Sequence, residues 1–332
     1  MKQRFYIYQS GELKRQDQSL VFITNKDEKI YIPIMQIELI NVFSQIIVNS
    51  AAYALLNQYG ITIHYFNYFG NYYGSFVPDV PKLGKTIINQ VEHIINNEKR
   101  IVVAKEIILA SAYNMRALLK YYHKKRSICK DQINLIDTLF ESLEELNTEQ
   151  LNDIMLIEAR IKQIYYSCFD EIIFQNQFCF GRRSVRPPLN EVNAMMSFGY
   201  QMLYSLIESI IHRSSLVLHL PFIHSYERRK EGLQFDIADI FKPVVIDRTI
   251  FRLINRKQIS KMHFENKNEG VYLNKLGGTI FIEELEAFMK TTISTNGSNR
   301  KYSYNQIISK EIHKLTNHIN DKETYSGFRM RW

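Results

Sequence analysis

The feature that most constrains the fold is a change in hydrophobic periodicity near residue 80. Before it, apolar and polar residues alternate over short stretches rich in β-branched and aromatic side chains, as in half-buried strands. After it, apolar residues recur at the spacing of amphipathic helices. The two patterns meet at residues 78–85, Pro-Asp-Val-Pro-Lys-Leu-Gly-Lys, whose prolines and glycine interrupt both. We therefore predict an α+β protein of two domains, for which 332 residues are sufficient.

The predicted domain boundaries follow from this change. Residues 1–80 form a small, mainly antiparallel β-domain, residues 81–90 a linker, and residues 91–332 a larger, mainly α-helical domain. We expect strands at 4–8, 19–24, 29–34, 36–40, 61–66 and 72–77, and a short helix at 51–58 after Ser50 as its N-cap. Further helices are expected near 86–128, 131–145, 147–174, 188–213, 236–256, 282–291 and 303–319. Gly277 and Gly278 are expected to form a turn, and residues 292–299 a polar loop.

Charge and composition narrow the class of protein. The formal net charge is +8, which favours a polyanionic partner such as nucleic acid. Three cysteines without C-x-x-C spacing argue against a disulfide framework or a zinc site. No stretch has the length and apolarity of a membrane span, and the first residues are unlike a signal peptide, so we expect a cytoplasmic protein. Nucleotide-binding glycine motifs and the G-x-S-x-G motif of hydrolases are missing from the sequence.

One carboxylate lies where a core residue is expected. In the predicted helix around 153–174, Ile154, Ile157 and Ile161 fall on one apolar stripe, and Glu158 lies inside it. A carboxylate that faces a core is costly unless it is paired, protonated or bound to a metal. From this helix alone, a partner arginine or a partly exposed position explains Glu158 as well as a metal does.

Three more candidates lie further along the chain. His224 ends an apolar run directly before a basic stretch, which suits a ligand or a general base but also a structural histidine. Asp236 and Asp239 are three residues apart, on one face of a helix start. Asp236 is also explained as an N-cap, and Asp239 as a first-turn acid stabilised by the helix dipole. The second explanation is the weaker one, because the neighbours of Asp239 are apolar.

Together these residues form a mixed oxygen and nitrogen ligand set. Glu158, His224 and Asp239 suit Mg²⁺ or Mn²⁺, with positions left open for water and phosphate oxygens. Such an ion can polarise a phosphodiester and activate a hydroxyl nucleophile. The sequence does not decide between the two metals.

Basic residues accompany this set. The candidate DNA-binding residues are Arg182, Arg183, Arg186, Arg228, Arg229 and Lys230. The last three follow His224 and would place positive charge beside the metal, where a phosphate backbone would lie. A further cluster, Tyr-Tyr-His-Lys-Lys-Arg at 121–126, ends a long predicted helix. Each cluster is also explained as a solvated surface, and for 121–126 the helix C-terminus itself favours cations.

Several motifs occur in a specific order. Residues 186–200 read Arg-Pro-Pro-Leu-Asn-Glu-Val-Asn-Ala-Met-Met-Ser-Phe-Gly-Tyr, after Ile-Glu-Ala at 157–159 and before Phe-Ile-His at 222–224. Leu-Gln-Phe-Asp-Ile-Ala-Asp-Ile-Phe follows at 233–241. This ordered set resembles the CRISPR-associated integrase family that inserts new spacers, over nearly the whole chain. Pro221 and Gly232 depart from residues common in the family, but neither change removes a ligand.

The resemblance implies a function and partners. It implies a metal held by Glu158, His224 and Asp239, with Asp236 close by as a further catalytic residue. It also implies a homodimer formed through the β-domains, a small ferredoxin-like partner protein, and double-stranded DNA substrates, the protospacer and the CRISPR repeat. The implied reaction is transesterification, in which the 3′-hydroxyl of a short DNA fragment attacks the repeat, with metal-dependent endonuclease activity alongside it.

Two other classes of function remain open at this point. A catalytically inert DNA-binding scaffold would bind DNA in a salt-sensitive way, with no step that depends on metal. A small-molecule metal hydrolase would need a closed pocket and little excess positive charge, so the net charge of +8 counts against it.

Overall fold

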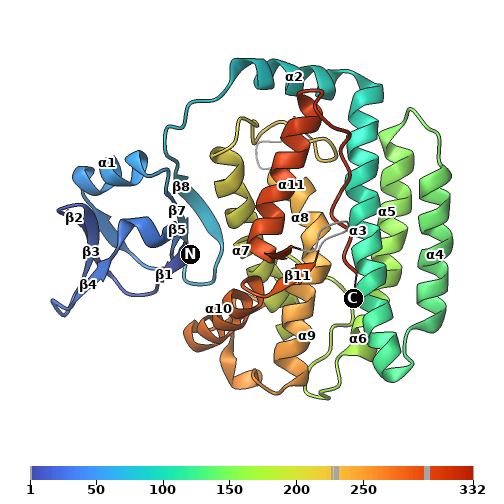
Figure 1. The fold of residues 1–332 in the computed structure, drawn as a ribbon. Helices are drawn as coiled ribbons and strands as arrows, with labels where there is room; N and C mark the ends of the chain where they lie inside the picture. The colour runs from blue at the N-terminus through green and yellow to red at the C-terminus, as the bar shows by residue number, and fades with distance from the viewer. Residues whose placement is uncertain (1, 226, 228–231, 295–299, 332) are drawn as a thin grey trace.

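The chain folds into N-terminal β-sheets followed by a mainly helical region, as the computed structural model in Figure 1 shows. The structure describes residues 2–225, 227, 232–294 and 300–331. The predicted α+β class is confirmed. Within the described residues, no helix combines the length and apolarity needed to cross a membrane.

The N-terminal domain contains two four-stranded sheets, ordered β1–β5–β7–β8 and β4–β3–β2–β6. Its elements are β1 (Gln3–Ile7), β2 (Gly11–Gln16), β3 (Ser19–Thr24), β4 (Lys29–Ile32), β5 (Ile37–Val42), β6 (Ile46–Val48), α1 (Ser50–Gln58), β7 (Thr62–Phe66) and β8 (Tyr72–Phe76). The pairs β1–β5, β5–β7 and β2–β6 are parallel, and the pairs β2–β3, β3–β4 and β7–β8 are antiparallel. This corrects the expected, mainly antiparallel domain. Turn residues signal hairpins locally, whereas parallel partners are distant along the chain.

The helical region begins earlier than expected. Its helices are α2 (Gly84–Ile95), α3 (Asn97–Arg126), α4 (Lys130–Glu145), α5 (Leu151–Ser167), α6 (Phe169–Ile172), α7 (Glu191–His212), α8 (Leu233–Phe241), α9 (Arg248–Asn255), α10 (Lys275–Met289) and α11 (Tyr304–Ile319). A π-helical segment, Lys242–Asp247, joins α8 to α9. Because α2 starts at Gly84, most of the expected linker 81–90 is helical. The long helix expected at 86–128 is divided at Asn96, whose side chain accepts from Lys99 N and caps α3.

Two short hairpins interrupt the helices. They are β9 (Phe264–Lys267) with β10 (Gly270–Leu273), and β11 (Thr292–Ser294) with β12 (Lys301–Ser303). Part of the loop expected at 292–299 is therefore a strand. The turn expected at Gly277 and Gly278 is wrong, because both lie inside α10, which Asn274 caps. A Cβ at Gly277 would stand 2.3 Å from His263 O, so glycine permits a close approach there rather than a turn.

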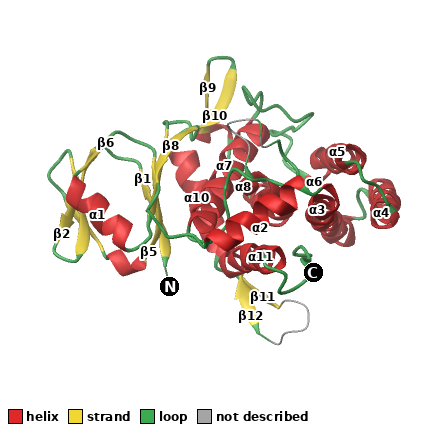
Figure 2. Ribbon diagram, turned by 90° about the horizontal axis from the view of Figure 1, so that it is seen from above, coloured by secondary structure: helices red, strands yellow, loops and turns green. Residues whose placement is uncertain are grey.

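Two apolar cores meet at the first sheet. The N-terminal core lies between the two sheets and α1, with Leu13, Ile40 and Leu55 fully buried. The opposite face of the first sheet contributes Leu39 and Phe66 to the larger core of the helical region. Figure 2 shows the sheets on one side of the helices, with α4 and α5 on the far side. The first sheet is therefore shared between the two domains.

Polar contacts reinforce this junction. Arg4 on β1 donates to both carboxylate oxygens of Glu286 on α10, at 2.6 and 2.8 Å. His64 on β7 is fully buried against α7, with its Nε2 atom 3.2 Å from Ser209 Oγ. Burial lowers the pKa of His64 to about 4, although the nearby Glu208 carboxylate favours the protonated form.

The His64 contact predicts a pH-dependent stability. The unfolded imidazole has a pKa of about 6.5, so the folded protein binds the proton less tightly than the unfolded chain. The contribution of His64 to the free energy of unfolding is therefore fully present above about pH 6.5 and is lost as the pH falls towards about 4. We expect the free energy of unfolding to fall by about 3 kcal/mol over this range because of this single group. Urea unfolding across this range measures it.

His64→Gln should remove that part of the pH dependence, whereas the exposed His313→Gln should not. Equal pH profiles for the wild type and both variants would contradict the assignment to His64.

Gly199 on α7 is a second test of the packing. A Cβ there would stand 2.6 Å from Ile246 Cγ2 and 2.7 Å from Phe281 Cζ. We expect Gly199→Ala to destabilise the protein by about 1–3 kcal/mol through overpacking, which outweighs the ~1 kcal/mol gain in helix propensity. The matched control is Gly74→Ala, whose Cβ would meet no atom within 4 Å. A thermal unfolding midpoint for Gly199→Ala at or above that of Gly74→Ala would refute this packing.

Candidate active site

The predicted site residues lie on two helices and one loop. Glu158 is in the second turn of α5, and Asp236 and Asp239 are in α8. His224 is in the loop between α7 and α8. Glu158 is 9% exposed and Asp239 3% exposed, so two carboxylates lie inside the helical region. The expected place of Glu158 within a buried stripe is confirmed.

A lysine links the two buried carboxylates. The Nζ atom of Lys162, one turn after Glu158, lies 2.6 Å from Glu158 Oε1 and 3.0 Å from Asp239 Oδ2. Lys242 pairs with the other oxygen of Asp239. Burial alone would raise the pKa of Asp239, but the two ammonium groups outweigh it and hold that pKa below its usual range. We call Glu158 and Asp239 the acid pair.

Sequence reasoning assigned no role to Lys162 and Lys242. A signal was present, because these lysines follow the acidic residues by four and three positions, the spacings at which helical side chains meet. Only the structure shows that Lys162 also reaches the second helix.

Asp236 is fully buried and binds the loop segment that contains His224. Its carboxylate accepts from the backbone N–H groups of Phe222, Ile223 and His224 at 2.6, 3.0 and 3.2 Å, and its Oδ1 atom lies 2.5 Å from His224 Nδ1. With these partners its oxygens are occupied, and the carboxylate holds residues 222–224 in place. The alternative reading of Asp236 as an N-cap is wrong, because Gly232 holds that position.

The contact with Asp236 also orients the imidazole. Because Nδ1 faces Asp236, Nε2 is the atom of His224 that remains for a ligand. Burial lowers the pKa of His224, but the hydrogen bond and the negative charge of Asp236 outweigh this, and the pKa is raised. The negative charge of Asp239 raises the pKa of His224 in the same direction.

The side chains of the acid pair and of His224 have the chemistry of metal ligands. Within the described ranges, no three His, Cys, Asp or Glu side chains already lie close enough to share an ion. Glu158 Oε1 is buried. Its 2.6 Å contact with Lys162 Nζ is an ion pair without hydrogen-bond geometry, so within the described residues this oxygen accepts no hydrogen bond. The acid pair and His224 Nε2 form the mixed oxygen and nitrogen set that Mg²⁺ and Mn²⁺ accept. The positive charge that the acid pair requires is supplied here by lysine.

A second buried network supports the helices around the acid pair. Asp247, at the end of the π-helical segment, accepts hydrogen bonds from Tyr165 Oη and Tyr200 Oη, both at 2.7 Å. Burial raises the pKa of Asp247 to about 6, although the two hydrogen bonds oppose this shift. These contacts join α5, α7 and the end of the π-helical segment. Sequence reasoning missed Asp247, because a single acid in an apolar segment does not reveal its partners.

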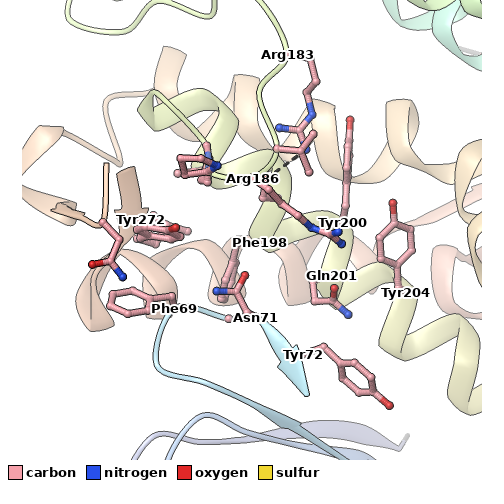
Figure 3. Close-up of a pocket in the computed structure, with 18 of the residues that line it drawn as sticks. Phe69, Asn71, Tyr72, Arg183, Arg186, Phe198, Tyr200, Gln201, Tyr204 and Tyr272 are labelled. Carbon is pink, nitrogen blue, oxygen red and sulfur yellow. Dashed lines mark hydrogen bonds between the residues drawn. The ribbon is translucent and has the colours of Figure 1, made fainter. Parts of the chain in front are cut away.

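The structure contains an open cavity of about 760 Å³ (Figure 3). It is bounded by the β7–β8 turn, the loop before α7, α7 itself and the β9–β10 hairpin. Phe235, which lines it, is 5.7 Å from His224 and 4.6 Å from Tyr204, measured between ring centroids. Lys242 Nζ lies 5.1 Å from the centroid of the Tyr204 ring. His224 and Lys242 therefore each contact an aromatic ring that lines the cavity.

The predicted basic residues differ in their surroundings. Arg183 and Arg186 line the cavity, whereas Arg182 is exposed on the same loop. Arg183 donates to Asn193 Oδ1 at 2.9 Å and to Ser197 Oγ at 3.2 Å, so part of its role is to hold this loop on α7. The predicted residues Arg228, Arg229 and Lys230 lie outside the described residues.

Comparison with known proteins identifies the family. The family described as "CRISPR associated protein Cas1" matches residues 5–287. The chain belongs to the Cas1 family. It is 33% identical to "CRISPR-associated endonuclease Cas1 2" of Thermodesulfovibrio yellowstonii over the full length of both chains. It is 37% identical to "CRISPR-associated endonuclease Cas1" of Methanothermobacter thermautotrophicus, over 100% of this chain and 96% of that protein.

Solved structures agree with this membership. A Cas1 protein from Thermotoga maritima superposes with a TM-score of 0.87 at 31% identity, over 98% of this chain and 100% of that one. A casposase bound to its integration product has a TM-score of 0.82 at 18% identity, over 99% of this chain and 93% of that one. The casposase therefore shares the fold of this Cas1 family member.

The role of Asp236 is testable. Asp236→Asn removes the charge and turns one acceptor into a donor that faces N–H groups. We expect the free energy of unfolding to fall by about 1–3 kcal/mol, and the amides of residues 222–224 to exchange hydrogen faster. Chemical unfolding and hydrogen exchange measure these changes. The exposed Asp321→Asn is the control, and unchanged exchange at 222–224 would show that Asp236 does not hold the loop.

Proposed function

We propose that this chain is a metal-dependent DNA integrase and endonuclease that inserts short foreign DNA fragments into a CRISPR array, in antiviral defence. The observation that carries the proposal is the buried acid pair, together with a histidine that Asp236 orients and whose ring lies 5.7 Å from Phe235 in the wall of an open cavity. The curated relatives named as endonucleases support it, and so does the fold shared with a casposase bound to its integration product.

Glu158, His224 and Asp239 would hold Mg²⁺ or Mn²⁺. When bound, such an ion supplies a Lewis acid for the phosphodiester and for the attacking hydroxyl. Binding at the acid pair requires the Lys162 ammonium group to release at least one carboxylate, because its Nζ atom lies within 3.0 Å of both. Because Lys162 Nζ directly contacts both carboxylates, its replacement by a metal ion requires only a local movement of the lysine side chain.

The chain's own residues would position the reactants. In the proposed reaction, the 3′-hydroxyl oxygen of the fragment forms a bond to a repeat phosphorus, and the bond from that phosphorus to its leaving oxygen breaks, so the number of phosphodiesters is conserved. Lys242 and Lys162 would stabilise negative charge on the phosphate. Asp236 would hold His224, and no side-chain nucleophile is needed, since positioning and charge stabilisation provide the catalysis.

The proposed partners are double-stranded DNA, a second copy of the chain and a small ferredoxin-like protein. A complex that contains both Cas1 and Cas2 has this fold in one of its chains, with a TM-score of 0.82. For the homodimer, large apolar side chains are exposed on the β-domain at Ile30, Tyr31, Met35 and Ile47. They lie on or beside β4 and β6, the edge strands of the second sheet, where a second copy would cover them.

One observation favours an alternative, a catalytically inert DNA-binding scaffold. In such a protein the lysines would neutralise the acid pair permanently, as Lys162 and Lys242 do here. The scaffold would bind DNA without any step that depends on metal. Dependence of strand joining on Mn²⁺ separates the two functions.

The predicted test is integration of a labelled DNA duplex into a repeat-bearing plasmid, with the small partner protein and Mn²⁺ present. Glu158→Ala, His224→Ala and Asp239→Ala should each lower the rate at least ~100-fold, because each removes a ligand of the ion that stabilises the transition state. An unfolding midpoint equal to that of the wild type shows that a variant keeps the fold. The exposed Glu269→Ala is the control. Full activity in all three variants would refute the site.

A further inference from the structure

A second pocket lies at the end of the helical region where α3 ends. It has a volume of about 200 Å³ and lies between the last turn of α3, α9 and the residues after α6. Its charged lining residues are Lys125, Arg126, Arg252 and Arg256, and its lining contains no carboxylate. We call it the α3–α9 pocket. It includes part of the basic cluster at 121–126, which the active site does not use.

Positive charge in this pocket exceeds the negative charge beside it. Arg248, Arg252 and Arg256 recur every fourth residue and so share one face of α9 and its C-terminal end. Arg252 pairs with Glu284 at 2.8 Å. Arg126 and Arg256 have no ion pair with any carboxylate in the described part of the chain. The pocket therefore retains uncompensated cationic groups.

Aromatic rings hold these cations in place. The Arg126 guanidinium lies 3.3 Å from the centroid of the Phe174 ring, and Lys125 Nζ lies 4.2 Å from that of the Tyr121 ring. Lys125 also donates to Tyr121 Oη at 2.6 Å. A cation on an aromatic face keeps its donors available while its side chain is ordered, which lowers the entropy lost on binding an anion.

We propose that the α3–α9 pocket binds phosphate groups of a DNA strand, at a place separate from the acid pair. From Glu158 to Ser167, where α5 ends, the helix rises roughly 14 Å. Phe174 lies beyond this end and beyond α6, so a DNA strand that reaches both places must be longer than a single nucleotide. This inference rests on the proposed function, because it extends the surface over which DNA is held.

The size and chemistry of the pocket suit the phosphate groups of a nucleic acid. A depression of about 200 Å³ accepts a phosphate group but is smaller than a usual small-molecule site. Arginine presents its donors in a planar fork that matches phosphate oxygens. The net charge of +8 adds long-range attraction for a polyanion.

The test is DNA binding across a salt series, measured by fluorescence anisotropy with a labelled duplex. Arg126→Gln combined with Arg256→Gln removes two cations. We expect the slope of log K against log salt to become about 1.8 shallower, and affinity to fall about 30-fold near ~150 mM salt. Arg126→Lys with Arg256→Lys should restore most of the slope, because the charge is kept.

The control is Lys290→Gln combined with Lys322→Gln, which removes the same net charge elsewhere on the exposed surface. Equal loss of affinity in the control and pocket variants, or none in the pocket variant, would overturn the proposal. So would a pocket variant that binds DNA normally but loses an acidic partner protein. Failure of the wild type to bind DNA would instead refute the proposed function, so the two failures are distinguishable.

Discussion

Two carboxylates inside an apolar helical region require positive charge beside them, and much of the site's geometry follows from that requirement. A buried ionised carboxylate without a partner is strongly destabilising. Lys162 satisfies both members of the acid pair and thereby joins α5 to α8. Lys242 adds a second cation to Asp239. The same negative charge that binds lysine here is what would attract a divalent ion.

Two buried acids outside the acid pair then determine where the helices and the loop lie. Asp236 accepts hydrogen bonds from three backbone amides and contacts the His224 ring, so residues 222–224 are held around a single carboxylate. Asp247 receives two tyrosine hydroxyls from α5 and α7. The elements that carry the candidate site residues are thus joined by hydrogen bonds that are shielded from water, where such bonds are strongest.

The first sheet couples the β-domain to this arrangement. Its inner face packs on the N-terminal core, while Leu39 and Phe66 on the other face enter the helical core. The β7–β8 turn also forms one wall of the cavity beside His224. The β-domain therefore shapes access to the site in addition to offering exposed apolar strands for a second copy. Glu158 lies near the middle of α5, whereas the α3–α9 pocket includes Phe174 beyond the C-terminal end of that helix, and this separation suits a protein that holds an extended polyanion.

The sequence by itself determined the α+β class, most helix positions and the identity of the candidate ligands. Periodicity and the order of motifs are local properties, so they can be read along the chain. Glu158 within an apolar stripe was visible in the same way. Only the tertiary structure decided the parallel strand pairing, the position of Gly277 inside α10, the role of Asp236 and the bridging by Lys162. Each of these depends on partners that are distant along the chain or on space around a backbone, and neither has a local sequence signal.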